Sequence, residues 1–223
     1  MPPGPSEAPP SLRRPRRFTW ERELRWVLTL GVVAPLLYFG VQLIVGLSTP
    51  GYSFLDSPAS DLGAAGQPHA LLFNAGAIAT GIAVAAAALG IACSTNVIAT
   101  SWAARLAVVL SVAAVASAAI GAVAAGVFPL PDERHGFAPY SAGTFAVPFI
   151  LPLVFWRTGA VARKVFLGNI ALFVAAGSIL ASIGNEASDF DGLAQRLLAA
   201  SVFPLIGFAS WLTRDARAAH TGL

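Results

Sequence analysis

Residues 26–47 read WVLTLGVVAPLLYFGVQLIVGL, a run without a charged side chain. At about 1.5 Å per residue, a helix of this length extends about 33 Å and crosses a hydrocarbon core about 30 Å thick. Similar apolar runs follow at residues 70–93, 105–128, 137–156, 165–183 and 193–212. The sequence therefore predicts an all-α membrane protein, a bundle of six transmembrane helices.

The basic residues alternate along the chain. Of the 14 Lys and Arg residues, all except Arg134 and Arg196 lie in the N-terminal segment, the even-numbered connections or the C-terminal segment. Short connections rich in Lys and Arg stay on the cytoplasmic side of a membrane. We therefore expect both termini to be cytoplasmic and the odd-numbered connections to face outward. Tryptophans fall at the expected inner boundaries of the spans, at Trp26, Trp102, Trp156 and Trp211.

The composition narrows the class of protein. The chain is 56% hydrophobic and 11% charged, with a mean hydropathy of +0.71, whereas a soluble domain is about 25% charged. The net charge of +3 does not indicate a nucleic-acid partner, because the basic residues are spread over short connections. Abundant Ala and a preference for Arg over Lys indicate a GC-rich bacterial genome. We therefore expect the protein in a bacterial cytoplasmic (inner) membrane.

The chain divides into three regions. Residues 1–20 form a basic, Pro-rich tail that we expect to be disordered in the cytoplasm. Residues 21–213 form the six-helix transmembrane domain, and residues 214–223 form a short cytoplasmic tail. The first span is longer than the core of a signal peptide, about 7–15 residues, and no A-x-A-like cleavage site follows it. We interpret it as a retained helix.

Small residues recur at helical spacing in the second and third spans. Such residues let two helices approach closely, which supplies packing energy in lipid. The two series are Ala77, Gly81 and Ala85, and Ala114, Ala118, Ala122 and Gly126. We expect these two spans to form a tight antiparallel hairpin at the bundle centre, and the other spans to face lipid more.

Ionisable residues are missing from the middle of every predicted span. Their absence weighs against a proton-coupled transporter or a charged pore, but not against a carrier of neutral or apolar solutes. The polar groups at this depth include Gln42, Asn74, Thr80 and Asn169. We expect them to form hydrogen bonds between helices.

Polar residues that could take part in catalysis or binding lie at the expected outer mouth of the bundle. They are Ser60, Asp61, His69, Asn74, His135, Tyr140, Glu186 and Asp189. The candidates for catalysis are Asp61, His135 and Glu186, since carboxylates and imidazoles act as acids and bases. The candidates for ligand binding are Ser60, Asn74, Tyr140 and Asp189.

His69 and His135 are the only histidines on the outer side that could bind a metal, and no HExxH spacing exists. A catalytic zinc site needs about three protein ligands, and the single cysteine, Cys93, cannot complete one. We therefore expect neither a metal nor a cofactor. In the alternative interpretation, the carboxylates form a solvated rim, His135 is a loop or cap residue, and Ser60-Asp61 and Ser188-Asp189 cap helices.

Several short motifs occur in a familiar order along the chain. They are Ser60-Asp61-Leu62-Gly63, Phe73-Asn74 with Gly81, Gly126-Val127-Phe128-Pro129, and His135-Gly136. With these motifs, residues 25–212 resemble the six-span prokaryotic membrane proteins catalogued as Domain of Unknown Function 998. Members more often carry Glu or another residue where Asp61 stands. The resemblance implies a six-helix membrane fold without an established activity. It draws attention to Ser60, Gly63, Asn74, Pro129 and His135.

Three functions remain open. The leading hypothesis is an integral membrane protein that binds membrane lipids or another membrane protein, without catalysis of its own. It would use the acidic outer mouth and the groove beside the small-residue hairpin. The alternative is a membrane-embedded hydrolase of lipid or envelope substrates, with the outer-face histidine and carboxylates as its site. The third is a carrier of neutral or apolar solutes, with helices broken at Pro35, Pro148, Pro152 and Pro204.

Overall fold

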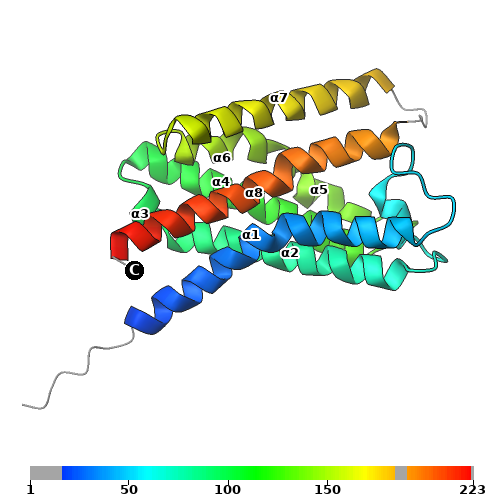
Figure 1. Ribbon diagram of the computed structural model, residues 1–223, viewed down its shortest axis with the longest axis horizontal. Helices are drawn as coiled ribbons and strands as arrows, with labels where there is room; N and C mark the ends of the chain where they lie inside the picture. Colours follow the sequence, from blue (N-terminus) through cyan, green and yellow to red (C-terminus); the bar gives the residue numbers. More distant parts are fainter. Residues whose placement is uncertain (1–16, 184–189, 222–223) are drawn as a thin grey trace, which may run out of the picture.

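A computed structural model of the chain describes residues 17–183 and 190–221, and within them all regular structure is helical. The long helices lie side by side along one axis (Figure 1). Five of them are long and apolar enough to cross a membrane. They are α1 (Arg17–Leu47), α2 (Ala70–Cys93), α4 (Trp102–Val127), α7 (Ala160–Ile183) and α8 (Asp191–Thr221). These helices confirm the expected class, an all-helical multi-pass membrane protein.

The expected fourth span, 137–156, is not one continuous helix. It consists of η2 (His135–Phe137), α5 (Ala138–Ser141), η3 (Ala142–Ala146) and α6 (Val147–Phe155). Pro148 lies in the first turn of α6 and Pro152 lies further inside it. Proline lacks an N–H, so Pro148 cannot donate a helical hydrogen bond to the preceding turn, and the α-helical ladder is interrupted there. Five long helices and one broken segment therefore stand where the sequence predicted six spans.

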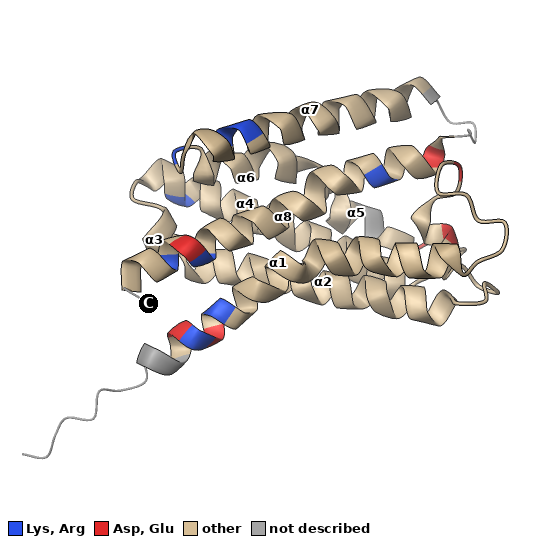
Figure 2. Cartoon of the chain, in the orientation of Figure 1, with Lys and Arg blue, Asp and Glu red and all other residues tan. Residues whose placement is uncertain are grey.

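The first and last helical residues lie at the same end of the bundle, and Lys and Arg gather toward this end (Figures 1 and 2). We call it the inner end, for its expected side. The opposite, outer end carries the connections 48–69 and 128–137, the short helix η1 (Ala59–Gly63) and the beginning of α8. At the inner end, α3 (Thr95–Ile98) joins α2 to α4. That the inner end faces the cytoplasm stays a prediction.

The α2–α4 hairpin has the most extensive contact between any two elements of the described chain, as the small residues predict. A Cβ atom added at Gly81 would lie 2.8 Å from the Ala119 carbonyl oxygen and 2.9 Å from the Val123 nitrogen. At Gly126 it would lie 2.5 Å from the Asn74 carbonyl oxygen. Backbone therefore meets backbone at these two glycines, which is the close approach that packing in lipid requires.

The expectation that the last span faces lipid more than the α2–α4 hairpin does is wrong. In α8, 56% of the most apolar stretch is buried, against 44% in α2 and 39% in α4. The reason is close packing on α1: a Cβ at Gly31 would collide with Ser210, and one at Gly207 would lie 3.2 Å from Pro35. Helix α7, with 11% buried, covers one side of the bundle and is the most exposed described span (Figure 1).

Candidate functional site

A cleft of about 370 Å³ opens at the outer end, between α1, α4, α8 and the broken segment. Its polar lining residues are Tyr38, Ser60, His135, Ser141, Thr144 and Gln195. The apolar wall consists of small residues of α4, among them Ala118 and Ala122, and of the rings of Phe145 and Phe203. Among the described residues, no carboxylate lines this outer cleft.

The connection before α2 is fastened to the start of α8, and this brings Ser60 to the cleft. The backbone N–H of Ala59 donates to Gln195 Oε1 at 2.6 Å. The N–H of Leu193 donates to the carbonyl of Leu55 at 2.8 Å. A Cβ at Gly192 would lie 2.9 Å from the Leu55 carbonyl oxygen, so a glycine permits this docking.

His135 is held by the end of α4. Its Nδ1 lies 2.8 Å from the carbonyl oxygen of Phe128. Because a carbonyl oxygen only accepts, Nδ1 carries the proton in this contact, and Nε2 of the neutral ring is an acceptor. The next residue, Gly136, has a φ of 72°, a left-handed conformation that glycine adopts without strain. It lies inside η2 and lets the chain turn between His135 and α5.

Of the sequence-predicted residues, Ser60 and His135 lie on the same cleft, while Asn74 has another role. Asn74 Nδ2 donates to the carbonyl of Gly63 at 3.0 Å and so fixes the end of η1 on α2. Its Oδ1 is buried without a hydrogen-bond partner. A Cβ at Gly63 would collide with this oxygen, so the contact between Asn74 and residue 63 requires glycine.

The other predicted residues lie outside the lining of the cleft. Asp61, next to Ser60, is half-buried, and this burial raises the pKa of its carboxyl while the charge of Arg196 opposes the rise. His69 and Tyr140 are exposed. Glu186 and Asp189 lie outside the described residues. Within the described part of the chain, no group of three His, Cys, Asp or Glu side chains could hold a metal ion.

Arg196 organises the outer connection, although in the sequence it stands out only as an exception to the charge pattern. Its Nη1 donates to the carbonyls of Phe54, Ser57 and Gly192 at 2.8, 3.0 and 2.8 Å. Its Nη2 donates to the hydroxyl of Tyr52. The guanidinium thus holds the connection after α1 on α8, beside the cleft. The signal for this role in the sequence is that Arg196 is a single arginine in an otherwise acidic outer connection.

A second cavity lies next to the outer cleft and is lined in part by α7. It has a volume of about 200 Å³ and shares Tyr38, Thr144, Phe145, Gln195 and Phe203 with the outer cleft. It adds Phe173 of α7 and the α8 residues Leu198, Ala199 and Val202. The added wall is apolar, and α7 is the most exposed of the described spans. The outer cleft therefore adjoins an apolar cavity that is lined in part by the exposed helix α7.

The expected groove beside the hairpin is also present. It has a volume of about 390 Å³ and lies along α2 and α4, between Gly81, Ala85, Ala119 and Val127. All of its lining residues are apolar. It offers packing but no directed hydrogen bond, whereas the outer cleft offers both. The outer cleft is therefore the stronger candidate for a specific ligand site.

Comparisons with known proteins identify the family of this chain. No curated protein and no solved structure matches the chain. A family model described as "Protein of unknown function (DUF998)" matches residues 32–212. This range extends from α1 to α8 and contains the α2–α4 hairpin, the broken segment and the outer cleft. Because the match covers most of its length, the chain belongs to the DUF998 family.

Proposed function

We propose that this protein is an inner-membrane protein that binds one amphipathic molecule of the membrane, a lipid or lipid-like compound, in the outer cleft. It carries out no reaction on this ligand. The observation that supports the proposal is that two different environments adjoin each other, because five residues line both cavities. Uncharged hydrogen-bonding groups line the outer cleft near Ser60 and His135, and apolar side chains line the second cavity near Phe173 and Val202.

The size and chemistry of the cleft suit such a ligand. A volume of about 370 Å³ falls within the range of about 300–1,000 Å³ typical of small-molecule sites. The hydroxyls of Ser60 and Thr144 and the amide of Gln195 can both donate and accept hydrogen bonds. They would hold a neutral polar headgroup, while the second cavity, beside α7, receives the apolar tail and gives entry from the lipid phase.

A substitution that fills the cleft tests this proposal. Ala122 lines the cleft and is only partly buried, so Ala122→Leu removes space for the ligand. Ala113 lies on an exposed face of the same helix, and Ala113→Leu is the matched control. We expect the wild-type protein and the control to retain one amphipathic molecule through purification, as measured by native mass spectrometry. Ala122→Leu should retain several-fold less.

Two further measurements make this result decisive. Size-exclusion chromatography and circular dichroism show whether each variant is folded. If folded Ala122→Leu protein retains as much ligand as folded Ala113→Leu protein, the outer cleft is not the binding site. If the wild-type protein retains no amphipathic molecule and takes up none from mixed micelles, the binding function itself is wrong.

The second candidate function is hydrolysis of a lipid or envelope substrate, because Ser60 and His135 lie on one cleft. With Nδ1 bound to the Phe128 carbonyl, Nε2 of His135 is the basic nitrogen, the atom that activates a serine nucleophile in hydrolases. Asp61, next in sequence, would act as an acid–base group or metal ligand. A stoichiometric transition metal that is lost in His135→Ala, or a lipid product that is lost in Ser60→Ala, would support the enzyme over the binding protein.

A further inference from the structure

A second pocket lies at the inner end of the bundle, on the opposite side of the membrane domain from the outer cleft. It has a volume of about 190 Å³ between α1 and α8. Arg25 of α1 lines it, together with Trp211, Arg214, Asp215 and Ala218 of α8. Two arginines from different helices therefore face one small space, which we call the inner pocket.

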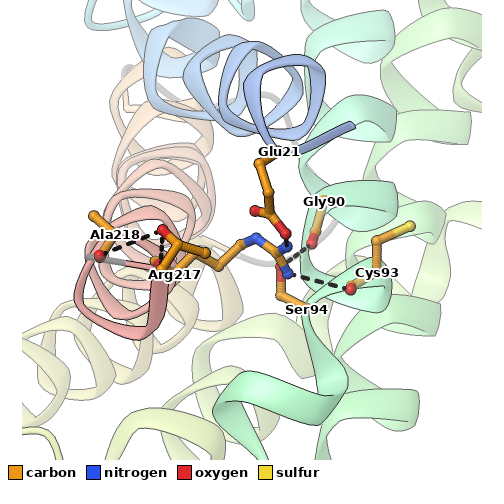
Figure 3. A network of polar contacts seen from close by, with 7 residues as sticks. Glu21, Gly90, Cys93, Ser94, Arg217 and Ala218 are labelled. Carbon is orange, nitrogen blue, oxygen red and sulfur yellow. Dashed lines mark hydrogen bonds and ion pairs between the residues drawn. The ribbon is translucent and has the colours of Figure 1, made fainter. Parts of the chain in front are cut away.

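Among the described residues, no carboxylate forms an ion pair with either arginine of the inner pocket. Glu21, four residues before Arg25, is the residue with which Arg25 would ordinarily pair on a helix. In the structure, Glu21 instead binds Arg217, with 2.5 Å between Oε1 and Nη2 (Figure 3). Asp215 lines the same pocket but is exposed.

The structure holds both arginines near the same turn of α1. Thr29 Oγ1 donates to the carbonyl oxygen of Arg25 at 2.7 Å. The same hydroxyl oxygen accepts from Arg214 Nη1 at 3.4 Å. Both arginines are half-buried, so their mutual repulsion is less screened than it would be in water. An anion between them would convert this repulsion into attraction.

We propose that the inner pocket binds the phosphate group of an anionic membrane lipid. Guanidinium groups bind phosphate through paired hydrogen bonds, and two of them are available here. Trp211 lines the pocket, and its exposed ring stacks on Phe208. Because tryptophan is enriched at the membrane–water interface, we expect the pocket to lie at that level. A basic pocket between helices at this level matches the headgroup position of an anionic lipid. The lipid chains would then extend along the apolar surfaces of α1 and α8.

A double variant with a matched control tests the inner pocket. Arg25→Gln/Arg214→Gln removes both charges from it. Arg105→Gln/Arg163→Gln removes the same charge from exposed residues at the starts of α4 and α7, also at the inner end. We would measure binding of the full-length protein to phosphatidylglycerol and to phosphatidylcholine in mixed micelles by native mass spectrometry, and confirm folding by size-exclusion chromatography.

We expect the wild-type protein to prefer phosphatidylglycerol. The pocket variant should lose this preference by about tenfold or more, and the control should change by less than about twofold. Equal losses in the two variants would mean diffuse attraction and would overturn the proposal. Inorganic phosphate that competes at concentrations similar to the lipid would show that the site takes free phosphate, and the lipid proposal would be wrong. Arg25→Lys/Arg214→Lys keeps the charge and should retain part of the preference.

Discussion

Arg217 of α8 and Glu21 of α1 form an ion pair of 2.5 Å that joins the two ends of the described chain (Figure 3). The Arg217 side chain is 8% exposed and that of Glu21 is 25% exposed. Arg217 Nη1 also contacts the carbonyl of Cys93 at 3.5 Å and the hydroxyl of Ser94 at 3.4 Å, at the end of α2. One guanidinium therefore connects three helices at the inner end.

Removal of Glu21 should destabilise the protein by leaving Arg217 buried without a counter-charge. For Glu21→Gln we expect a loss of about 1–3 kcal/mol, below the cost of breaking a fully buried pair because Glu21 is partly exposed. The double variant Glu21→Met/Arg217→Met should recover most of this loss, since no charge remains buried. Thermal unfolding of all variants in one detergent measures the effect. A double variant that is less stable than Glu21→Gln would contradict this explanation.

Arg196 should control the order of the outer connection. In Arg196→Ala, the carbonyls of Phe54, Ser57 and Gly192 lose their donor, and we expect a loss of about 3 kcal/mol. Arg196→Lys keeps the charge but not the planar guanidinium group with its several donors, so its loss of stability should be intermediate. Limited proteolysis of residues 48–58 should become faster in the same order. Arg134→Ala is the control, because this arginine is exposed and its loss should change stability much less than Arg196→Ala does.

The sequence predicts the long helices well, because length and apolarity alone decide whether a segment can span a bilayer. The close packing of α2 on α4 can also be predicted, because the approach of the two backbones needs only Gly and Ala at helical spacing. The burial of α8 could not be predicted, because it depends on tertiary contacts such as Gly207 with Pro35. The break before α6 depends on Pro148, and a proline inside an apolar run can equally leave a kinked but continuous helix.

The polar residues show the limit of prediction from depth alone. Asn169 Nδ2 donates to the Ser201 carbonyl of α8 at 2.8 Å, the expected bond between helices. Thr80 bonds within its own helix, to Gly76, and Gln42 is buried with neither amide atom paired in the structure. At the outer end, His135 and Ser60 reach one cleft, while Asn74 binds Gly63. Which loop residues converge depends on the fold of the connections, and no helical periodicity encodes it.

Asp132 should titrate at unusually low pH. Its hydrogen bonds from Arg134 lower the pKa of the carboxyl to about 2, from an ordinary value of 3.8. This lowering favours the folded state above pH 3.8, and the contribution is lost as the pH falls through about 2. Arg134→Gln should move the pKa back toward 3.8. The ¹³Cγ chemical shift of Asp132 in labelled protein, followed by NMR against pH, measures both values.

The orientation of the two ends can be measured with fused reporters. A reporter after Leu223 should be cytoplasmic, because Arg214 and Arg217 precede it and remain on the inner side. A reporter inserted after Glu133, between α4 and η2, should be periplasmic. A periplasmic signal from the C-terminal fusion would reverse the assignment of the two ends. Equal signals from both positions would mean that the broken segment does not bring the chain back across the membrane.

The closest approach within the hairpin should make Gly81 intolerant of a single methyl group. In Gly81→Ala the new Cβ would lie 2.8 Å from the Ala119 carbonyl oxygen and 2.9 Å from the Val123 nitrogen. These are backbone atoms of α4, so the two helices must separate, at a cost of about 1–3 kcal/mol. Helix α7 supplies the control: at Gly168 a Cβ would meet no atom within 4 Å, and Gly168→Ala should stabilise its helix by about 0.5–1 kcal/mol. Thermal unfolding of both variants gives the comparison, and a Gly81→Ala protein as stable as Gly168→Ala would show that the hairpin is looser than the structure indicates.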